Sequence, residues 1–151
     1  MSDADNVQPE EETPSLFDQN EGVDWLLAYV IGLAEKDMSL SVIVTVGGQV
    51  ISGIVISGRK YIDEITAQMK AATVNGAPDE AGSWGEAMAS MFGDFKQVYA
   101  PKDDIAEEIA TKRNYLHLQD VSIVMGNQTH SFGVWRIQLS RVDGFTFGTW
   151  K

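Results

Sequence analysis

The side chains best suited to chemistry in this sequence are its two histidines, His117 and His130. A metal site needs three or four ligands, and neither histidine has a second histidine or a carboxylate at ligand spacing. Ser131 is a candidate nucleophile beside His130, but adjacent strand residues point to opposite faces, so the pair cannot act as nucleophile and base. His117 alternates with Leu116 and Leu118, and we expect it on the outer face of a strand. These residues predict neither a catalytic site nor a metal site.

A second candidate is Ser57-Gly58-Arg59-Lys60, where a glycine and two cations end a predicted strand. Such a turn can hold a phosphate, although a strand-to-helix turn with solvated cations is the commoner outcome. Acidic pairs at 103–104 and 107–108 would form a weak cation patch or, more commonly, a solvated helix face. The chain contains no cysteine, no nucleophile elbow and no Walker loop. We therefore expect no enzymatic activity and no cofactor.

The net charge of −11 is concentrated at the start of the chain. The first 24 residues carry eight acidic residues and no basic one, whereas the other 127 carry 14 acidic and 11 basic residues. This pattern predicts a disordered acidic tail over residues 1–22 and a single domain over 23–151. There is no apolar run of membrane-spanning length and no secretory signal pattern, so we expect a cytoplasmic protein without membrane contact.

Hydrophobic periodicity predicts the elements of this domain. A helix should begin after Asp24, which can cap its first turn, and end around residues 36–38. Two strands over 39–46 and 50–57 should form a hairpin, because Gly47 and Gly48 can both take positive φ. Gly53 in the return strand indicates a bend or bulge.

A helical insertion is expected over about 61–112, with a loop over 73–83 and a third helix over about 102–112. Its middle helix carries an apolar stripe that either packs on the sheet or binds a protein partner. The stripe consists of Trp84, Met88, Met91, Phe92 and Phe95.

Strands are then predicted over 115–125, 129–139 and 142–147, with a change of alternation at Asp120-Val121 that implies a bulge or strong bend. The expected fold is α+β. It is a small, strongly bent five-stranded antiparallel sheet or barrel, with an N-terminal helix and the helical insertion between the second and third strands.

The hairpin resembles the first half of an Sm-like domain, and residues 116–123 and 135–142 resemble the second half. The matching hairpin positions are Val42, Val44, Val46, Gly48 and Gly53. Sm-like barrels often form rings by pairing edge strands, so the resemblance implies a homo-oligomer, unless the inserted helices cover the edges. The nucleotide-binding Asp, Asn and Arg-Gly positions of such domains are absent, and the acidic charge also disfavours phosphate binding. We expect no nucleic-acid partner.

Residues 24–151 are similar to the gas-vesicle accessory protein U family. The shared motifs are Asp24-Trp25-Leu26, the repeated Ser-Gly pairs at 52–53 and 57–58 with Tyr61, Tyr115-Leu116-His117-Leu118, Trp135-Arg136, and Val142-Asp143-Gly144-Phe145. The resemblance implies a non-enzymatic accessory or scaffold protein that acts by protein–protein interaction, with gas-vesicle components among its partners.

The expected partner-binding residues lie where the Ser-Gly-x-x-Tyr element ends, on the insertion and on the late strand. They are Arg59, Lys60, Tyr61, Trp84, Phe92, Trp135 and Arg136. The alternative is a sensor that binds a small ligand or peptide in a pocket between barrel and inserted helices. We expect a structural role for four glycines: Gly47, Gly48, Gly53 and Gly58.

Overall fold

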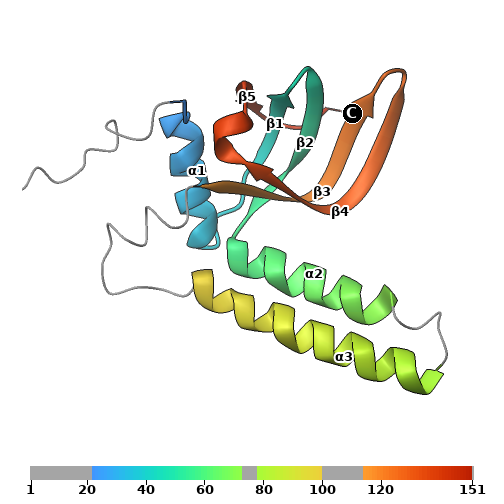
Figure 1. The fold of residues 1–151 in the computed structure, drawn as a ribbon. Helices are drawn as coiled ribbons and strands as arrows, with labels where there is room; N and C mark the ends of the chain where they lie inside the picture. The colour runs from blue at the N-terminus through green and yellow to red at the C-terminus, as the bar shows by residue number, and fades with distance from the viewer. Residues whose placement is uncertain (1–21, 73–77, 100–113, 151) are drawn as a thin grey trace, which may run out of the picture.

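The computed structural model of the chain describes residues 22–72, 78–99 and 114–150 (Figure 1). The elements in chain order are α1 (Trp25–Glu35), β1 (Ser41–Val46), β2 (Gln49–Ile56), α2 (Gly58–Ala72), α3 (Pro78–Asp94), η2 (Phe95–Tyr99), β3 (Tyr115–Met125), β4 (Gln128–Gln138), η3 (Leu139–Arg141) and β5 (Gly144–Phe147). The α+β class is confirmed. The acidic segment before residue 22 and the helix expected over about 102–112 lie outside the described residues.

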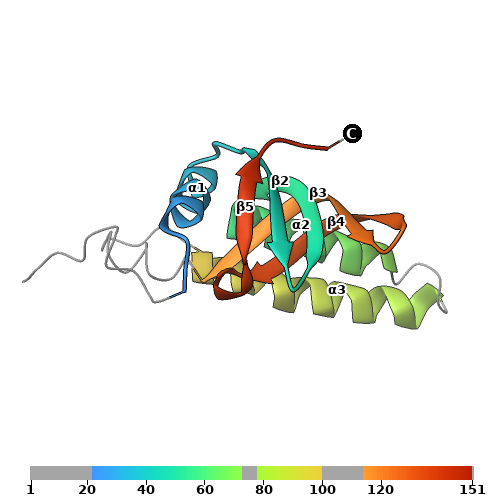
Figure 2. The same cartoon turned by 90° about the horizontal axis from the view of Figure 1, so that it is seen from above.

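All five strands form one antiparallel sheet in the order β4-β3-β2-β1-β5. The sheet does not close into a barrel, because β4 and β5 lie at opposite edges and do not pair with each other. Figure 2 shows the sheet from above, with its strands crossing over α2 and α3.

The sheet bends at a bulge between β2 and β3, where the two irregularities predicted from the sequence lie opposite each other. Gly53 and Asp120 lie opposite each other, at the register shift between the pairs Ser52↔Ser122 and Ile54↔Gln119. Asp120 takes the left-handed conformation with φ of 51°, as the extra residue of a bulge often does. A Cβ on Gly53 would lie 3.0 Å from the Cβ of Leu118, so this position has little room for a side chain. Both predicted irregularities are therefore parts of one bulge.

The apolar core lies between α1 and one face of the sheet. Leu27 and Ile31 of α1 are fully or almost fully buried against strand residues such as Leu116 and Leu118. Asp24 caps α1 as expected, since its side chain accepts hydrogen bonds from the N–H groups of Leu26 and Leu27. Burial of this face supplies the main driving force for folding.

Helices α2 and α3 form a hairpin outside this core (Figure 1). α2 crosses the sheet where a Cβ on Gly133 would lie 3.0 Å from the amide nitrogen of Gln68. α3 packs mainly against α2, and Ala89 is buried. The helix begins at Pro78, within the segment 73–83 that we expected to be a loop, because proline suits the first position of a helix. No helix within the described residues is long and apolar enough to cross a membrane.

Candidate functional site

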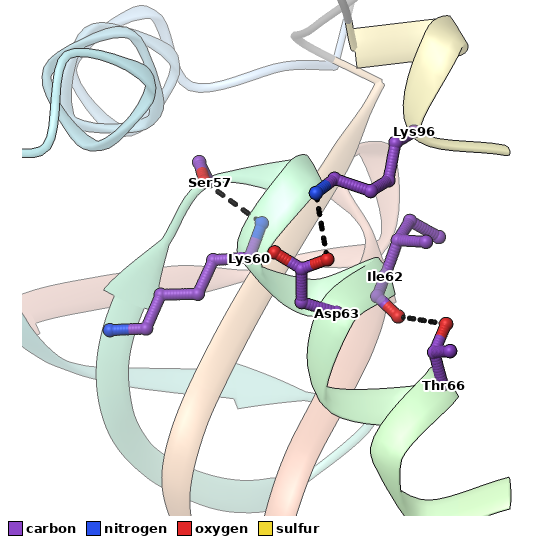
Figure 3. A network of polar contacts seen from close by, with 6 residues as sticks. All are labelled: Ser57, Lys60, Ile62, Asp63, Thr66 and Lys96. Carbon is purple, nitrogen blue, oxygen red and sulfur yellow. Dashed lines mark hydrogen bonds and ion pairs between the residues drawn. The ribbon is translucent and has the colours of Figure 1, made fainter. Parts of the chain in front are cut away.

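The first helical turn of α2 is held by acceptors from two other segments. The Ser57 hydroxyl oxygen accepts a hydrogen bond from the N–H of Lys60 at 3.1 Å (Figure 3). The Glu35 carboxylate, at the end of α1, accepts from the N–H of Gly58 at 2.9 Å. Free N–H groups at a helix start attract anions, and here a carboxylate of the same chain lies at this position. The Glu35 side chain therefore links α1 to the start of α2.

Gly58 is also a point of close approach between α2 and η2. A Cβ at this position would overlap the ring of Tyr99. We predicted a structural role for Gly58, and the structure offers a reason for one: without a side chain at this position, there is room for the Tyr99 ring. An ion pair joins the same two segments nearby, between Lys96 and Asp63 at 2.8 Å (Figure 3). This pair is solvent-exposed, so it contributes about 0–1 kcal/mol.

A cluster of aromatic and charged side chains fills the space between these helices and β3. The ring of Tyr61 lies against His117, with centroids 4.6 Å apart and planes inclined by 34°. The ring of Tyr99 meets the same histidine edge-on at 5.5 Å. Arg136 reaches the cluster from β4. We call Tyr61, Tyr99, His117 and Arg136 the tyrosine–histidine cluster.

Polar contacts run through this cluster in one direction. Arg136 donates a hydrogen bond to the Tyr99 hydroxyl at 3.4 Å, and that hydroxyl lies 3.5 Å from Nε2 of His117. A tyrosine that accepts from arginine is free to donate its own hydrogen, which requires an unprotonated Nε2 on the histidine. The guanidinium of Arg136 also stacks on the ring of Tyr115 at 3.8 Å. The arrangement fits a neutral imidazole.

Burial shifts the ionisation of both ring partners. Desolvation and then the nearby Arg136 cation lower the pKa of His117 to about 3. Desolvation is also the largest cause of the raised pKa of Tyr99, which Glu35 raises further and Arg136 opposes. Both side chains are therefore neutral at pH 7. The positively charged guanidinium of Arg136 thus lies beside an uncharged imidazole, which does not repel it.

We expected His117 on the outer face of its strand, but it is buried, with 2% of its surface exposed. It does point away from Leu116 and Leu118, but α2 and η2 cover that face. The expectation missed Tyr99 and Glu35 as well, because each is distant in sequence from the motifs that they contact.

The cluster does not have the geometry of an active site. The rings of Tyr61 and Tyr99 pack directly on His117, which leaves the imidazole without access for a substrate. Ser131 and His130 pair with Ser122 and Ile123, and so lie on opposite faces of β4. Among the described residues, no three His, Asp or Glu side chains are grouped to hold a metal ion. The acidic pairs at 103–104 and 107–108 lie outside this part of the chain.

The predicted partner-binding residues fall into separate places. Tyr61 and Arg136 meet in the tyrosine–histidine cluster, whereas Trp135 lies on the other face of β4 against Phe132, at 4.9 Å between ring centroids. Lys60 is exposed and Arg59 half-buried in the first turn of α2. Phe92 is half-buried on α3, and the side chain of Trp84 lies outside the described set. Two of the seven predicted residues thus lie beside His117: Tyr61 through its ring contact and Arg136 as the cross-strand neighbour on β4.

Residues 24–150 match the protein family described as Gas vesicle protein GvpU-like. The chain belongs to this family. No curated protein and no solved structure matches it significantly. The suspected family is therefore confirmed over nearly the whole domain, and it is a family of gas vesicle accessory proteins.

Motif positions of this GvpU-like chain that are far apart in sequence meet at the tyrosine–histidine cluster. Ser57 and Gly58 shape the start of α2, Tyr61 and His117 stack, and Arg136 closes the polar chain. The motifs thus describe how the helical hairpin is attached to the sheet. The helical hairpin attached in this way also carries an exposed apolar surface.

That surface lies on α3 and η2. Three large apolar side chains are strongly exposed there: Met91 at 48%, Phe95 at 44% and Val98 at 51%. Met91 lies in the last turn of α3, and Phe95 and Val98 lie three residues apart in the 3-10 helix η2, where residues at this spacing fall on the same side. Phe95 is braced by an edge-on contact with Phe92 at 5.4 Å. We call Met91, Phe95 and Val98 the α3 stripe.

Proposed function

We propose that this GvpU-like chain is a non-enzymatic accessory protein that binds a protein of the gas vesicle through the α3 stripe. The observation that carries this proposal is a group of three apolar side chains, each between 44% and 51% exposed, in the last turn of α3 and in η2, which both pack against α2. Contiguous exposed apolar side chains on a soluble domain typically mark an interaction site.

The composition of the α3 stripe suits a protein partner. Met91 lies in the last turn of α3, and Phe95 and Val98 follow on the 3-10 helix η2, so the stripe spans the junction of two short helical segments. Methionine adapts its shape to a partner more easily than branched side chains do. The exposed side chains in the first turns of α2 differ, because Lys60 and Glu64 are charged. Among the side chains that the structure describes on the hairpin, the α3 stripe therefore has the character of an interface.

The tyrosine–histidine cluster has a positioning role in this proposal. It fixes the base of the hairpin on the sheet through buried rings and the Glu35 contact with Gly58. Lys60 and Arg59 lie at the same base, and we propose them as polar contacts at the rim of the interface. The alternative of a ligand pocket near Tyr61 has less support, because rings of His117 and Tyr99 occupy that position.

Flotation with purified gas vesicles tests the proposal, because the buoyant vesicles carry bound protein to the surface. We expect the wild-type chain to float with the vesicles and the variant Met91→Glu/Phe95→Glu to remain below. The exposed fraction is 48% for Met91 and 44% for Phe95, so the free energy of unfolding should change by about 1 kcal/mol or less per substitution.

The variant Ala67→Glu/Ala71→Glu is the matched control, since it adds the same charge on exposed positions of α2. It should float like the wild type. Equal flotation of the α3 variant and the wild type would contradict the assignment of the interface to the α3 stripe. Absence of the wild-type chain from the floating fraction would contradict vesicle binding itself.

A further inference from the structure

Over residues 128–135, the outer edge of β4 lacks the charged side chains and proline that commonly protect an edge strand. β4 is the last strand of the open sheet, and within the part of the chain that the structure describes it pairs with β3 alone. Natural edge strands are commonly protected by charged side chains, proline, or very short length. Residues 128–135 contain no Lys, Arg, Asp, Glu or Pro, and the strand is 11 residues long.

Apolar surface lies beside this edge. Phe132 is 37% exposed on the face of the sheet that it shares with Val121 and Trp135. In an antiparallel edge strand, alternate residues direct unpaired N–H and C=O groups outward. An added strand would satisfy those groups and would cover part of the Phe132 ring. The edge therefore fits a strand whose own side chains carry little charge.

We propose that the β4 strand of a second copy of this chain pairs with this edge, so that two sheets continue as one across a two-fold axis. A two-fold pairing places each strand against itself, which is unfavourable when like charges face each other. Because residues 128–135 carry no such charge, any two-fold register within this segment avoids like-charge pairs.

The length of the two edges favours β4 over β5 as the partner. β5 comprises only Gly144–Phe147, and the chain leaves the strand at Gly148 with φ of 116°. Pairing β4 with the β5 of another copy would use four residues of an 11-residue edge. Pairing β4 with a second β4 can use the uncharged segment on both sides. A closed dimer, not a ring, is the expected product.

Charge-swap variants test this pairing. Thr129 and Ser131 are exposed on one face of β4, beside Val124 and Ser122. By light scattering, the wild-type chain should have twice its chain mass of 16.6 kDa. The variant Thr129→Lys/Ser131→Lys and the variant Thr129→Glu/Ser131→Glu should each be monomeric, with melting temperatures close to that of the wild type. An equimolar mixture of the two should recover the dimer, because opposite charges then face each other.

The variant Thr146→Lys on β5 is the control, and it should remain dimeric. A ring-sized wild-type mass that Thr146→Lys abolishes would overturn the proposal in favour of β4–β5 pairing. A wild-type monomer, or a dimer unaffected by the β4 lysines, would also overturn it. The inference stands apart from the vesicle-binding proposal, because monomeric variants that still float with vesicles would leave that proposal intact.

Discussion

The ring of Tyr61 lies 4.6 Å from the ring of His117, inclined by 34°. This contact joins the first turns of α2 to the beginning of β3, across 56 positions of the sequence. Tyr99 covers the same imidazole from η2. One buried histidine therefore anchors the insertion at two places, at Tyr61 near its beginning and at Tyr99. Changes at this anchor should alter the free energy of unfolding.

The first prediction concerns pH. The folded-state pKa of His117 is about 3, well below the ordinary value of about 6.5, so the unfolded chain takes up a proton that the folded chain does not. Stability from this group is complete above pH 6.5 and is lost progressively as the pH falls toward 3. Between pH 7.5 and 5.5 the loss should be about 1.4 kcal/mol.

Urea unfolding at the two pH values measures this loss, and the variant His117→Phe should remove most of it while retaining an aromatic ring beside Tyr61. His130→Gln, at an exposed position on β4, controls for the loss of a histidine elsewhere. If the wild type and His117→Phe show the same change in unfolding free energy between the two pH values, the imidazole is not held neutral as described.

A second prediction concerns Gly58. Alanine normally stabilises a helix relative to glycine by about 1 kcal/mol in its interior, but a Cβ at Gly58 would overlap the Tyr99 ring. We therefore expect Gly58→Ala to destabilise the chain by roughly 1–3 kcal/mol, as overpacking does. Thermal unfolding compares it with Gly32→Ala in α1, where a Cβ would meet nothing within 4 Å. The Gly32 variant should melt at or above the wild-type temperature, and a similar gain for Gly58→Ala would contradict the packing described for Tyr99.

Gly53→Val is the third prediction, and it tests the bulge. A Cβ there would lie 3.0 Å from the Cβ of Leu118 and 3.2 Å from the carbonyl oxygen of Gln119, so a branched side chain must displace the neighbouring strand. The expected loss is roughly 1–3 kcal/mol in the free energy of unfolding. Gly144→Ala is a suitable comparison, because its nearest neighbour would be at an ordinary 3.5 Å. Unchanged urea midpoints for Gly53→Val would mean that the strands are not in close contact there.

A fourth prediction separates the ion pair from the buried cluster. Lys96→Ala removes the contact with Asp63. The side chain of Lys96 is 42% exposed and that of Asp63 is 57% exposed. Exposed pairs contribute little, so the unfolding free energy should fall by less than about 1 kcal/mol. A salt titration of the wild type should show an effect of the same small size. A loss larger than that of Gly58→Ala would shift the main attachment of α3 from the aromatic rings to this pair.

Local patterns in the sequence predicted much of the sheet. Gly47 and Gly48 both take positive φ in the two-residue hairpin turn, and Gly53 and Asp120 mark the bulge as expected. These features depend on the backbone geometry of a few consecutive residues. Residue type and the alternation of apolar and polar residues indicate that geometry directly. The openness of the sheet was not predictable in this way, since closure depends on how β4 and β5 lie relative to each other.

The candidate site was harder to predict, because its contacts are non-local. Alternation correctly placed His117 opposite Leu116 and Leu118, but alternation does not tell whether a helix covers that face. The start of α3 at Pro78 was missed because Pro and Gly were taken as loop residues, although proline is compatible with the first turn of a helix. The family resemblance identified motif positions, and only the structure shows that several of them converge on one histidine.

The central claim is that a vesicle protein contacts the α3 stripe, and site-specific photocrosslinking tests it most directly. A benzophenone side chain at position 91 replaces the exposed Met91, and the same group at position 67 of α2 serves as the control. After irradiation with purified gas vesicles, mass spectrometry should identify a vesicle protein attached at position 91 and none at position 67. Crosslinks at position 67 but not at 91, or none at either position while the protein floats with the vesicles, would contradict the claim.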